Sequence, residues 1–147
     1  MSKYIVPYIT EFEYMCPCCG AYPPSFKEKD IGVPFQMLFD AFELIRNEWG
    51  RPIRIGGLTG GGGYRCPKYN SMVQGTYLSA HLFGLALDLD FNDADEVLEI
   101  DDFIESELPD LRRGTYTDAG SWIHIDVGYY IYPKASSRWR EGARWTG

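Results

Sequence analysis

The chain has 147 residues, of which 45% are hydrophobic and 24% charged, and it carries a formal net charge of −7. This length favours a single domain over residues 1–147 with a core of its own, and the composition excludes wholesale disorder. The excess of acidic residues argues against a nucleic-acid partner, because binding to phosphates requires a basic surface. No apolar run reaches the roughly 20 residues that a membrane span requires, so we expect no membrane partner.

The chain divides into a Cys- and Pro-rich N-terminal segment, residues 1–33, and a predicted core, residues 34–147. In the core, residues 34–49 carry apolar side chains at helical spacing, with a proline in the first turn and Gly50 after the last. Proline suits the start of a helix and glycine its end, so this segment predicts an amphipathic helix.

Four cysteines are distributed unevenly along the chain. Cys16, Cys18 and Cys19 fall in the segment CPCCG, and Cys66 stands alone. Two adjacent cysteines do not easily reach one tetrahedral ion, and no second pair follows at zinc-finger spacing, so a structural zinc is not favoured. A disulfide to Cys66 and a set of reduced thiols both stay open, and the reduced state is preferred because we see no secretory signal.

The middle of the chain predicts a short strand, a loop and a short helix. Residues 51–58 (RPIRIGGL) read as the strand, and residues 67–73 read as the helix, which begins at a proline. The four glycines at 60–63 lack a following Lys-Ser or Lys-Thr and therefore do not make a phosphate-binding loop. We expect a mobile loop there.

The second half of the chain predicts two strands that flank a helix. Residues 85–91 alternate between leucine or phenylalanine on one face and alanine or aspartate on the other, and residues 121–128 alternate in the same way. Residues 93–107 carry apolar positions at helical spacing behind an Asn-Asp cap. Helices and strands do not alternate regularly, so the predicted class is α+β, with a small antiparallel sheet and helices packed on one face.

Both histidines of the chain fall in these strand patterns. His124 and Asp88 each lie on the polar face of a predicted strand, and His81 precedes Asp88 by seven positions with Gly84 between them. A glycine allows the bend that returns His81 to Asp88. Two imidazoles and one carboxylate suit a single Zn²⁺ ion and leave its fourth position to water, as in catalytic sites. The alternative, ordinary packed histidines without a metal, stays open on spacing alone.

Three motifs follow one another in the sequence: YRCPxYN at 64–70, SxHxxGxAxD at 79–88 and WIHID at 122–126. Together they resemble the zinc peptidases of the D-Ala-D-Ala carboxypeptidase family, and the resemblance extends from about residue 35 to 127. That family cleaves peptidoglycan stem peptides as D,D-carboxypeptidases or L-alanyl-D-glutamate endopeptidases, includes many phage endolysins, and shares its fold with hedgehog signalling domains.

The resemblance implies a role for individual residues around a zinc cleft on the sheet face opposite the helices. His81, Asp88 and His124 match the three zinc ligands. Arg65 matches the arginine that holds the scissile carbonyl or a substrate carboxylate, a task that suits its planar fork of donors. The resemblance also implies supporting positions: Ser79 as a substrate contact or turn former, Trp122 as a wall of the cleft, and Asp126 as a support for the last ligand.

The chain departs from the family at the general base. The family's usual acid lies three residues before the last histidine, where this chain has Ser121. Hedgehog-type members carry an acid six residues before it, and Asp118 occupies that position. A carboxylate can accept a proton from water near neutral pH and a serine cannot, so Asp118 is the base that the sequence predicts.

Two functions follow from the resemblance. The first is a zinc-dependent peptidase with one Zn²⁺ ion and a peptidoglycan peptide as substrate. The alternative is a non-catalytic zinc-containing binding module of the same fold, which attaches to the cell wall or serves as a phage structural component. We expect a monomer made in the cytoplasm that acts at the cell wall after phage-type release, or else a chain whose leader has been removed.

Overall fold

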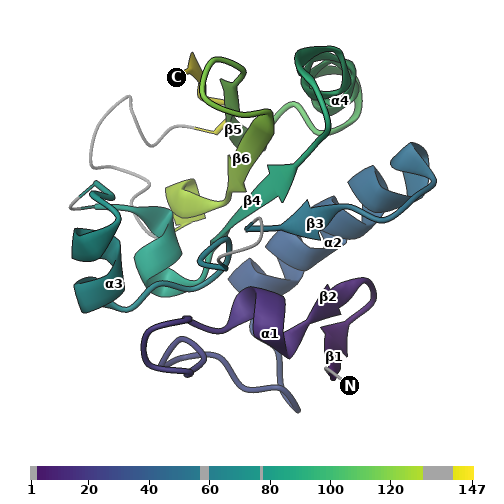
Figure 1. Cartoon of the computed structure of the whole chain (residues 1–147). Coiled ribbons are helices and arrows are strands. Elements are labelled where there is room, and N and C mark those ends of the chain that lie inside the picture. The colour runs from purple at the N-terminus through teal and green to yellow at the C-terminus, as the bar shows by residue number, and fades with distance from the viewer. Residues whose placement is uncertain (1–2, 57–59, 77, 131–140) are drawn as a thin grey trace.

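The computed structural model describes residues 3–56, 60–76, 78–130 and 141–147 (Figure 1). In chain order the elements are β1 (Tyr4–Val6), β2 (Ile9–Thr10), α1 (Glu11–Tyr14), α2 (Val33–Trp49), β3 (Arg54–Ile55), α3 (Pro67–Met72), the 3-10 helix η1 (Ala80–Phe83), β4 (Ala86–Asp90), α4 (Ala94–Glu107), β5 (Arg112–Tyr116), β6 (Trp122–Asp126), the 3-10 helix η2 (Gly128–Tyr130) and β7 (Arg144–Thr146). No helix in these ranges is long and apolar enough to span a bilayer.

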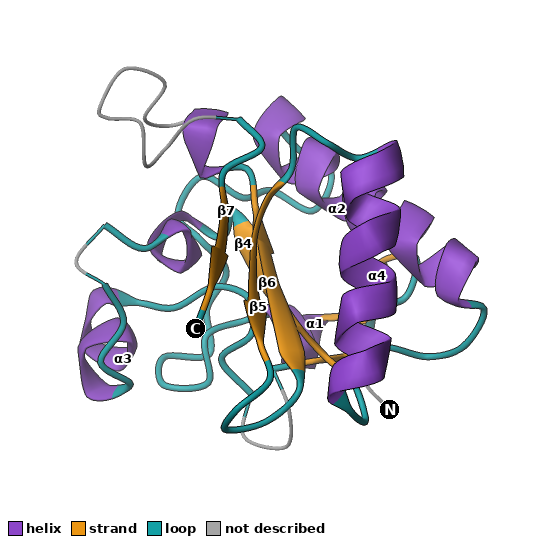
Figure 2. Cartoon of the chain, turned by 90° about the horizontal axis from the view of Figure 1, so that it is seen from above, coloured by secondary structure: helices purple, strands orange, loops and turns teal. Residues whose placement is uncertain are grey.

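The strands form a two-stranded sheet, β1-β2, and a five-stranded sheet in the order β3-β4-β6-β5-β7. The first four strands of the large sheet are antiparallel, and β7 adds to β5 in parallel. Figure 2 shows α2 and α4 on one side of this sheet and α3 on the other. The prediction of an α+β fold is confirmed, and the parallel edge strand β7 makes the large sheet mixed rather than purely antiparallel.

The core lies between the large sheet and the two long helices. Leu87 and Leu89 of β4 and Ile123 and Ile125 of β6 are fully buried and belong to one cluster with the inward faces of α2 and α4. The alternation predicted for both strands is thus present, because one face of each meets the helices and the other carries the polar residues.

Both long helices form where the sequence predicts them. Helix α2 has a proline in its first turn and ends at Gly50, whose φ of 76° is left-handed. Helix α4 begins after Asp93, whose side chain accepts a hydrogen bond from the Glu96 backbone. Glycine at the end and aspartate at the start satisfy backbone groups that the helix itself leaves free.

Strands β5 and β7 lie outside the predicted elements. Strand β5 has the sequence RRGTY, which lacks apolar alternation. Its Arg113 is fully buried and pairs with Asp101 and Glu105 of α4. A buried ion pair therefore takes the place of an apolar contact between β5 and α4. The strand predicted over 51–58 is shorter than expected, with only β3 in strand pairing, and residues 57–59 lie outside the described part of the chain.

The N-terminal segment packs into the same core as the rest of the chain. Tyr14 is fully buried among the rings of Phe26 and Phe39, and its hydroxyl donates to the Gly84 carbonyl at 2.6 Å. A Cβ on Gly84 would lie 2.4 Å from that hydroxyl oxygen. Glycine is needed here both for its left-handed φ of 71° and for the close approach of Tyr14.

The glycine run is packed tightly instead of forming the mobile loop that the sequence suggested. Gly61, Gly62 and Gly63 are buried. A Cβ on Gly62 would lie 2.4 Å from the Gly56 backbone, and one on Gly63 would lie 2.7 Å from the Tyr14 carbonyl oxygen. No side chain fits at these positions, so the glycines allow two backbone segments to touch.

We predict that Gly62→Ala destabilises the fold by about 1–3 kcal/mol, because the added methyl group meets backbone atoms that cannot move aside. The matched control is Gly32→Ala, where the Cβ meets its nearest neighbour at 3.8 Å and the expected cost is about 0.5 kcal/mol. Urea unfolding monitored by circular dichroism measures both values. Equal stability of the two variants would contradict the close packing of the run.

Candidate metal centre

The pairing of β4 with β6 places the predicted ligands side by side. Asp88 lies directly opposite His124 in the antiparallel register, on the sheet face away from α2 and α4. His81 comes from η1, and Gly84 ends this short helix in a left-handed conformation that turns the chain into β4. The bend inferred from the sequence is therefore present, and it brings His81 against Asp88.

The three side chains, called here the histidine centre (His81, Asp88 and His124), direct nitrogen and oxygen atoms at one point. Asp88 Oδ1 lies 3.2 Å from His81 Nε2 and 3.1 Å from His124 Nδ1. One potential ligand atom from each residue lies within 4.8 Å of the other two. Two imidazoles and a carboxylate at this spacing match the three-ligand set of a catalytic zinc.

The remaining nitrogen of each imidazole has its own acceptor. His81 Nδ1 lies 2.7 Å from the Gly63 carbonyl oxygen, and His124 Nε2 lies 2.6 Å from Asp126 Oδ2. A carbonyl only accepts, so His81 carries its proton on Nδ1 and turns a bare Nε2 toward Asp88. Two acceptors that face each other at 3.2 Å are satisfied by a cation between them, either a proton or a metal ion. With Nδ1 held by a carbonyl and Nε2 directed at Asp88, His81 has the arrangement of a metal-binding histidine.

The charges of the metal-free centre follow from the same contacts. Burial lowers the pKa of His81 below its ordinary value despite the neighbouring carboxylate. Burial acts against ionisation of Asp88 as well, but the neighbouring imidazoles, with His124 donating a hydrogen bond, hold the pKa of Asp88 well below its usual range. For His124, hydrogen bonds to Asp126 and Asp88 outweigh burial and raise the pKa to about 9. At neutral pH His124 is thus the protonated member.

Asp126 is held firmly beside His124. It is buried, its Oδ1 accepts from the Gly128 backbone at 2.8 Å, and the same oxygen lies 3.2 Å from Arg112 Nη1. The structure brings Asp126 to the outer nitrogen of His124, where a carboxylate fixes the ring orientation and its tautomer. This is the supporting position that the sequence predicts for it.

Three consecutive carbonyls of the glycine run contact the centre and its arginine. Gly61 accepts from Arg65 Nε at 2.8 Å, and Gly62 accepts from the Asp88 backbone at 2.8 Å. The Gly63 carbonyl oxygen lies 2.7 Å from His81 Nδ1. The run thus positions the site through its backbone. The motifs did not predict this backbone role, because glycine has no side chain that indicates one.

Arg65 and Ser79 both line the cleft around the histidine centre, which has a volume of about 470 Å³. Arg65 Nη2 lies 3.0 Å from Asp88 Oδ2, so the guanidinium engages the carboxylate oxygen that faces away from the imidazoles. The Ser79 hydroxyl accepts from the His81 backbone at 3.2 Å and caps η1. The turn-forming role inferred for Ser79 is present, and its substrate contact stays a prediction.

One wall of the cleft is aromatic. Trp122 stacks on Tyr116 with ring centroids 3.9 Å apart and planes 3° from parallel. Trp145 of β7 lies 5.5 Å from His124 between ring centroids and donates its indole N–H to the Tyr116 hydroxyl at 2.9 Å. Gly114 lies between His124 and Trp145 in the sheet, and a Cβ there would lie 2.2 Å from the indole nitrogen. Trp122 was predicted in this wall and Tyr116 was not; Trp145 packs beside His124 and Tyr116 without lining the cleft.

The structure separates the predicted base from the cleft. Asp118 is exposed in the turn between β5 and β6 and is not among the residues that line the cleft. Asp90 lines the cleft, two residues after Asp88 on the same face of β4 and opposite Trp122. The alternation of β4 is the sequence signal that places Asp90 on the same polar face as Asp88.

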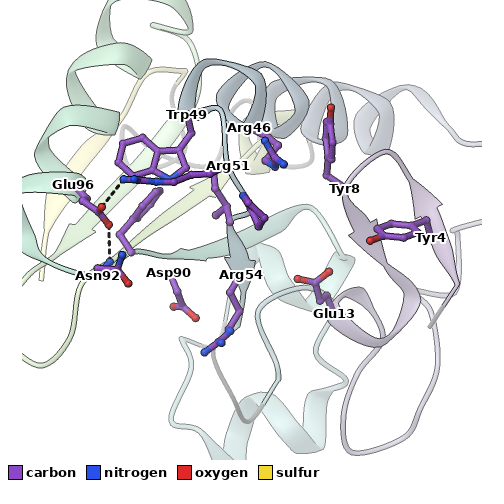
Figure 3. Close-up of a pocket in the computed structure, with 13 residues that line it drawn as sticks. Tyr4, Tyr8, Glu13, Arg46, Trp49, Arg51, Arg54, Asp90, Asn92 and Glu96 are labelled. Carbon is purple, nitrogen blue, oxygen red and sulfur yellow. Dashed lines mark hydrogen bonds and ion pairs between the residues drawn. The ribbon is translucent and has the colours of Figure 1, made fainter. Parts of the chain in front are cut away.

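A second groove of about 570 Å³ adjoins the cleft, and Asp90 lines both (Figure 3). Its lining includes Arg46, Arg51 and Arg54 together with aromatic side chains. Arg51 pairs with Glu96 at 2.7 Å, as Figure 3 shows. The groove therefore carries both guanidinium and carboxylate groups, and Asp90 is the residue that it shares with the cleft.

The structure also brings cysteines from distant parts of the chain together. One sulfur from each of Cys16, Cys19 and Cys66 lies within 4.8 Å of the other two. The sequence did not favour a structural zinc at these residues, because Cys18 and Cys19 are adjacent and no second cysteine pair follows at zinc-finger spacing. Packing of the N-terminal segment against the glycine run brings Cys66 next to Cys16 and Cys19.

A family model described as Peptidase M15 matches residues 11–126, from α1 through β6. The chain belongs to the peptidase M15 family. The resemblance to zinc D-Ala-D-Ala carboxypeptidases is confirmed at this level, and M15 is a family of zinc-dependent peptidases. Searches of curated proteins and of solved structures found no match. Strand β7 with Trp145 lies beyond the matched range.

We predict that the two histidines of the metal-free M15 chain titrate far apart. His124 has a pKa of about 9, and His81 titrates below its ordinary value of 6.5. Nitrogen-detected NMR of the two imidazoles after chelation measures both, and Asp126→Asn moves the His124 midpoint down toward 6.5 because it removes the carboxylate charge. Zinc binding below pH 9 must displace the His124 proton, so affinity rises with pH up to that value. Two midpoints near 6.5 would contradict this arrangement.

Proposed function

We propose that the chain is a zinc-dependent peptidase that hydrolyses peptidoglycan stem peptides, as a D,D-carboxypeptidase or an L-alanyl-D-glutamate endopeptidase. The observation that carries this proposal is the bare His81 Nε2 facing Asp88 Oδ1 at 3.2 Å, with His124 Nδ1 beside them. These residues would hold one zinc ion, which lowers the pKa of a bound water toward about 7 and polarises a carbonyl.

Arg65 is proposed to bind the substrate. Among the described residues its hydrogen bonds use Nε and Nη2, which leaves Nη1 to donate to a substrate carbonyl or carboxylate. The bonds to Gly61 and Asp88 hold the guanidinium at the centre, so little side-chain entropy is lost when the peptide binds. The stacked rings of Trp122 and Tyr116 supply an apolar wall for the alanine methyl groups of a stem peptide, and Ser79 lies in the same lining.

Two carboxylates are candidates for the proton acceptor. Asp118 matches the acid of hedgehog-type members, and Asp90 lines the cleft beside the histidine centre. We assign the acceptor to Asp90, because a general base must come within hydrogen-bond reach of the proton that it removes, directly or through one water. Asp118 lies in an exposed turn and serves as the comparison.

A non-catalytic zinc-containing binding module, for attachment to the cell wall or within a phage particle, is the second candidate. Ser121 occupies the position of the family's usual acid, and this substitution favours the binding module. Such a module binds zinc and peptidoglycan with the same cleft and leaves every peptide bond intact.

The deciding experiment is mass spectrometry of purified peptidoglycan after incubation with the zinc-loaded chain. We expect a new fragment whose mass identifies the bond cleaved. The same digestion with His124→Ala, checked for native near-ultraviolet circular dichroism, is expected to yield none. Intact peptidoglycan after treatment with zinc-loaded wild type would favour the binding module.

A pair of conservative variants tests the proton acceptor. We predict that Asp90→Asn lowers kcat by about 10²–10⁴-fold, the usual contribution of a general base, with zinc content unchanged. Asp118→Asn is expected to keep kcat within about twofold of wild type, because an exposed group outside the cleft takes no part in the transition state. The reverse result, with activity lost only in Asp118→Asn, would return the role to Asp118.

A further inference from the structure

Three cysteines outside the histidine centre converge in the manner of a metal site. The sulfurs of Cys16, Cys19 and Cys66 all lie within 4.8 Å of one another. In a tetrahedral zinc–thiolate site a Zn–S bond of about 2.3 Å separates the sulfurs by about 3.8 Å. Small side-chain rotations are therefore enough to bring all three onto one ion.

The backbone around Cys16 and Cys19 forms a tight turn that points both sulfurs the same way. The Gly20 N–H donates to the Cys16 carbonyl at 2.8 Å, and the Cys16 N–H donates to the Ala21 carbonyl at 3.0 Å. Gly20 has a left-handed φ of 65°, and nothing lies within 4 Å of a Cβ there. Two cysteines separated by two residues in such a turn have the spacing of zinc ligands.

Backbone N–H groups surround the sulfurs. The Cys66 N–H donates to Cys16 Sγ at 3.4 Å, and the Tyr69 N–H donates to Cys66 Sγ at 3.4 Å. A backbone N–H that donates to sulfur stabilises the thiolate, which is the form that binds metals.

We propose that Cys16, Cys19 and Cys66 bind a second zinc ion that is separate from the histidine centre. A disulfide joins two sulfurs and leaves the third of this group without a partner, whereas one ion engages all three. Cys19 is exposed, so the fourth position of the ion is open to solvent. Cys18 contacts the Cys66 side chain but lies outside the mutually close group, so it is assigned no ligand role.

The second ion ties the N-terminal segment to the chain that carries Arg65. Cys66 follows Arg65 directly, and the Arg65 N–H donates to the His81 carbonyl at 3.0 Å. The Tyr64 N–H donates to the Tyr14 carbonyl at 2.8 Å, two residues before Cys16. A zinc ion across this junction links α1 to the segment next to the cleft and stabilises the position of Arg65.

The experiment uses Co²⁺ as a probe in the full chain, purified under reducing conditions. Thiolate ligands give Co²⁺ an intense sulfur-to-metal charge-transfer absorption, which imidazole and carboxylate ligands do not give. We expect this absorption in wild type and, undiminished, in a His81→Ala/His124→Ala double variant that lacks the histidine centre. The result in the double variant separates this proposal from the proposed peptidase activity.

Matched cysteine variants identify the ligands. Cys19→Ser is expected to abolish the charge-transfer absorption, and its exposed position keeps the fold intact. Cys18→Ser removes the neighbouring thiol, which is also exposed, and is expected to retain the absorption. The proposal is overturned if reduced wild type binds Co²⁺ without this absorption, or if Cys18→Ser loses it while Cys19→Ser keeps it.

Discussion

Asp88 and His124 face each other across the β4–β6 pairing. The geometry of the cleft depends on this register. A slip of one residue would bring His124 into the core and an isoleucine into the cleft, because side chains alternate between the two faces of a strand. Leu87 and Ile125, fully buried beneath α2 and α4, make that slip costly. Hydrophobic burial on one face thus fixes the polar geometry on the other.

The buried carboxylate of Asp88 is the second constraint on the fold, because it must be paired. A carboxylate that is 8% exposed needs partners for both of its oxygens. Arg65 engages one oxygen, and the two imidazoles face the other. The glycine run holds this arrangement together because its carbonyls reach Arg65, the Asp88 backbone and His81 without any side chain in between. The absence of side chains there is what allows the backbone to act as part of the site.

Both ends of the described chain contribute to the surroundings of the cleft. Tyr14 and Cys16 bring the N-terminal segment against the glycine run and Cys66. At the other end, β7 pairs in parallel with β5 and lays Trp145 beside His124, in the space that Gly114 leaves open. The family match covers the first of these contacts but stops before β7. The aromatic packing around His124 is therefore built partly outside the matched segment.

The sequence by itself determined the elements whose burial follows a simple period. Helices α2 and α4 and strands β4 and β6 came from apolar spacing and end signals, and the polar face of the strands identified Asp88 and His124. Motif spacing added His81 and the family. These features are local, because each depends on side chains that repeat within one element.

Tertiary structure alone decided the features that depend on distant partners. Strand β5 could not be read from RRGTY, because its buried Arg113 is stabilised by acidic residues of α4 and not by apolar alternation. The exposure of Asp118 depends on how the β5–β6 turn leaves the sheet. The meeting of Cys66 with Cys16 depends on packing across the glycine run. No local pattern encodes a contact whose two halves lie fifty residues apart.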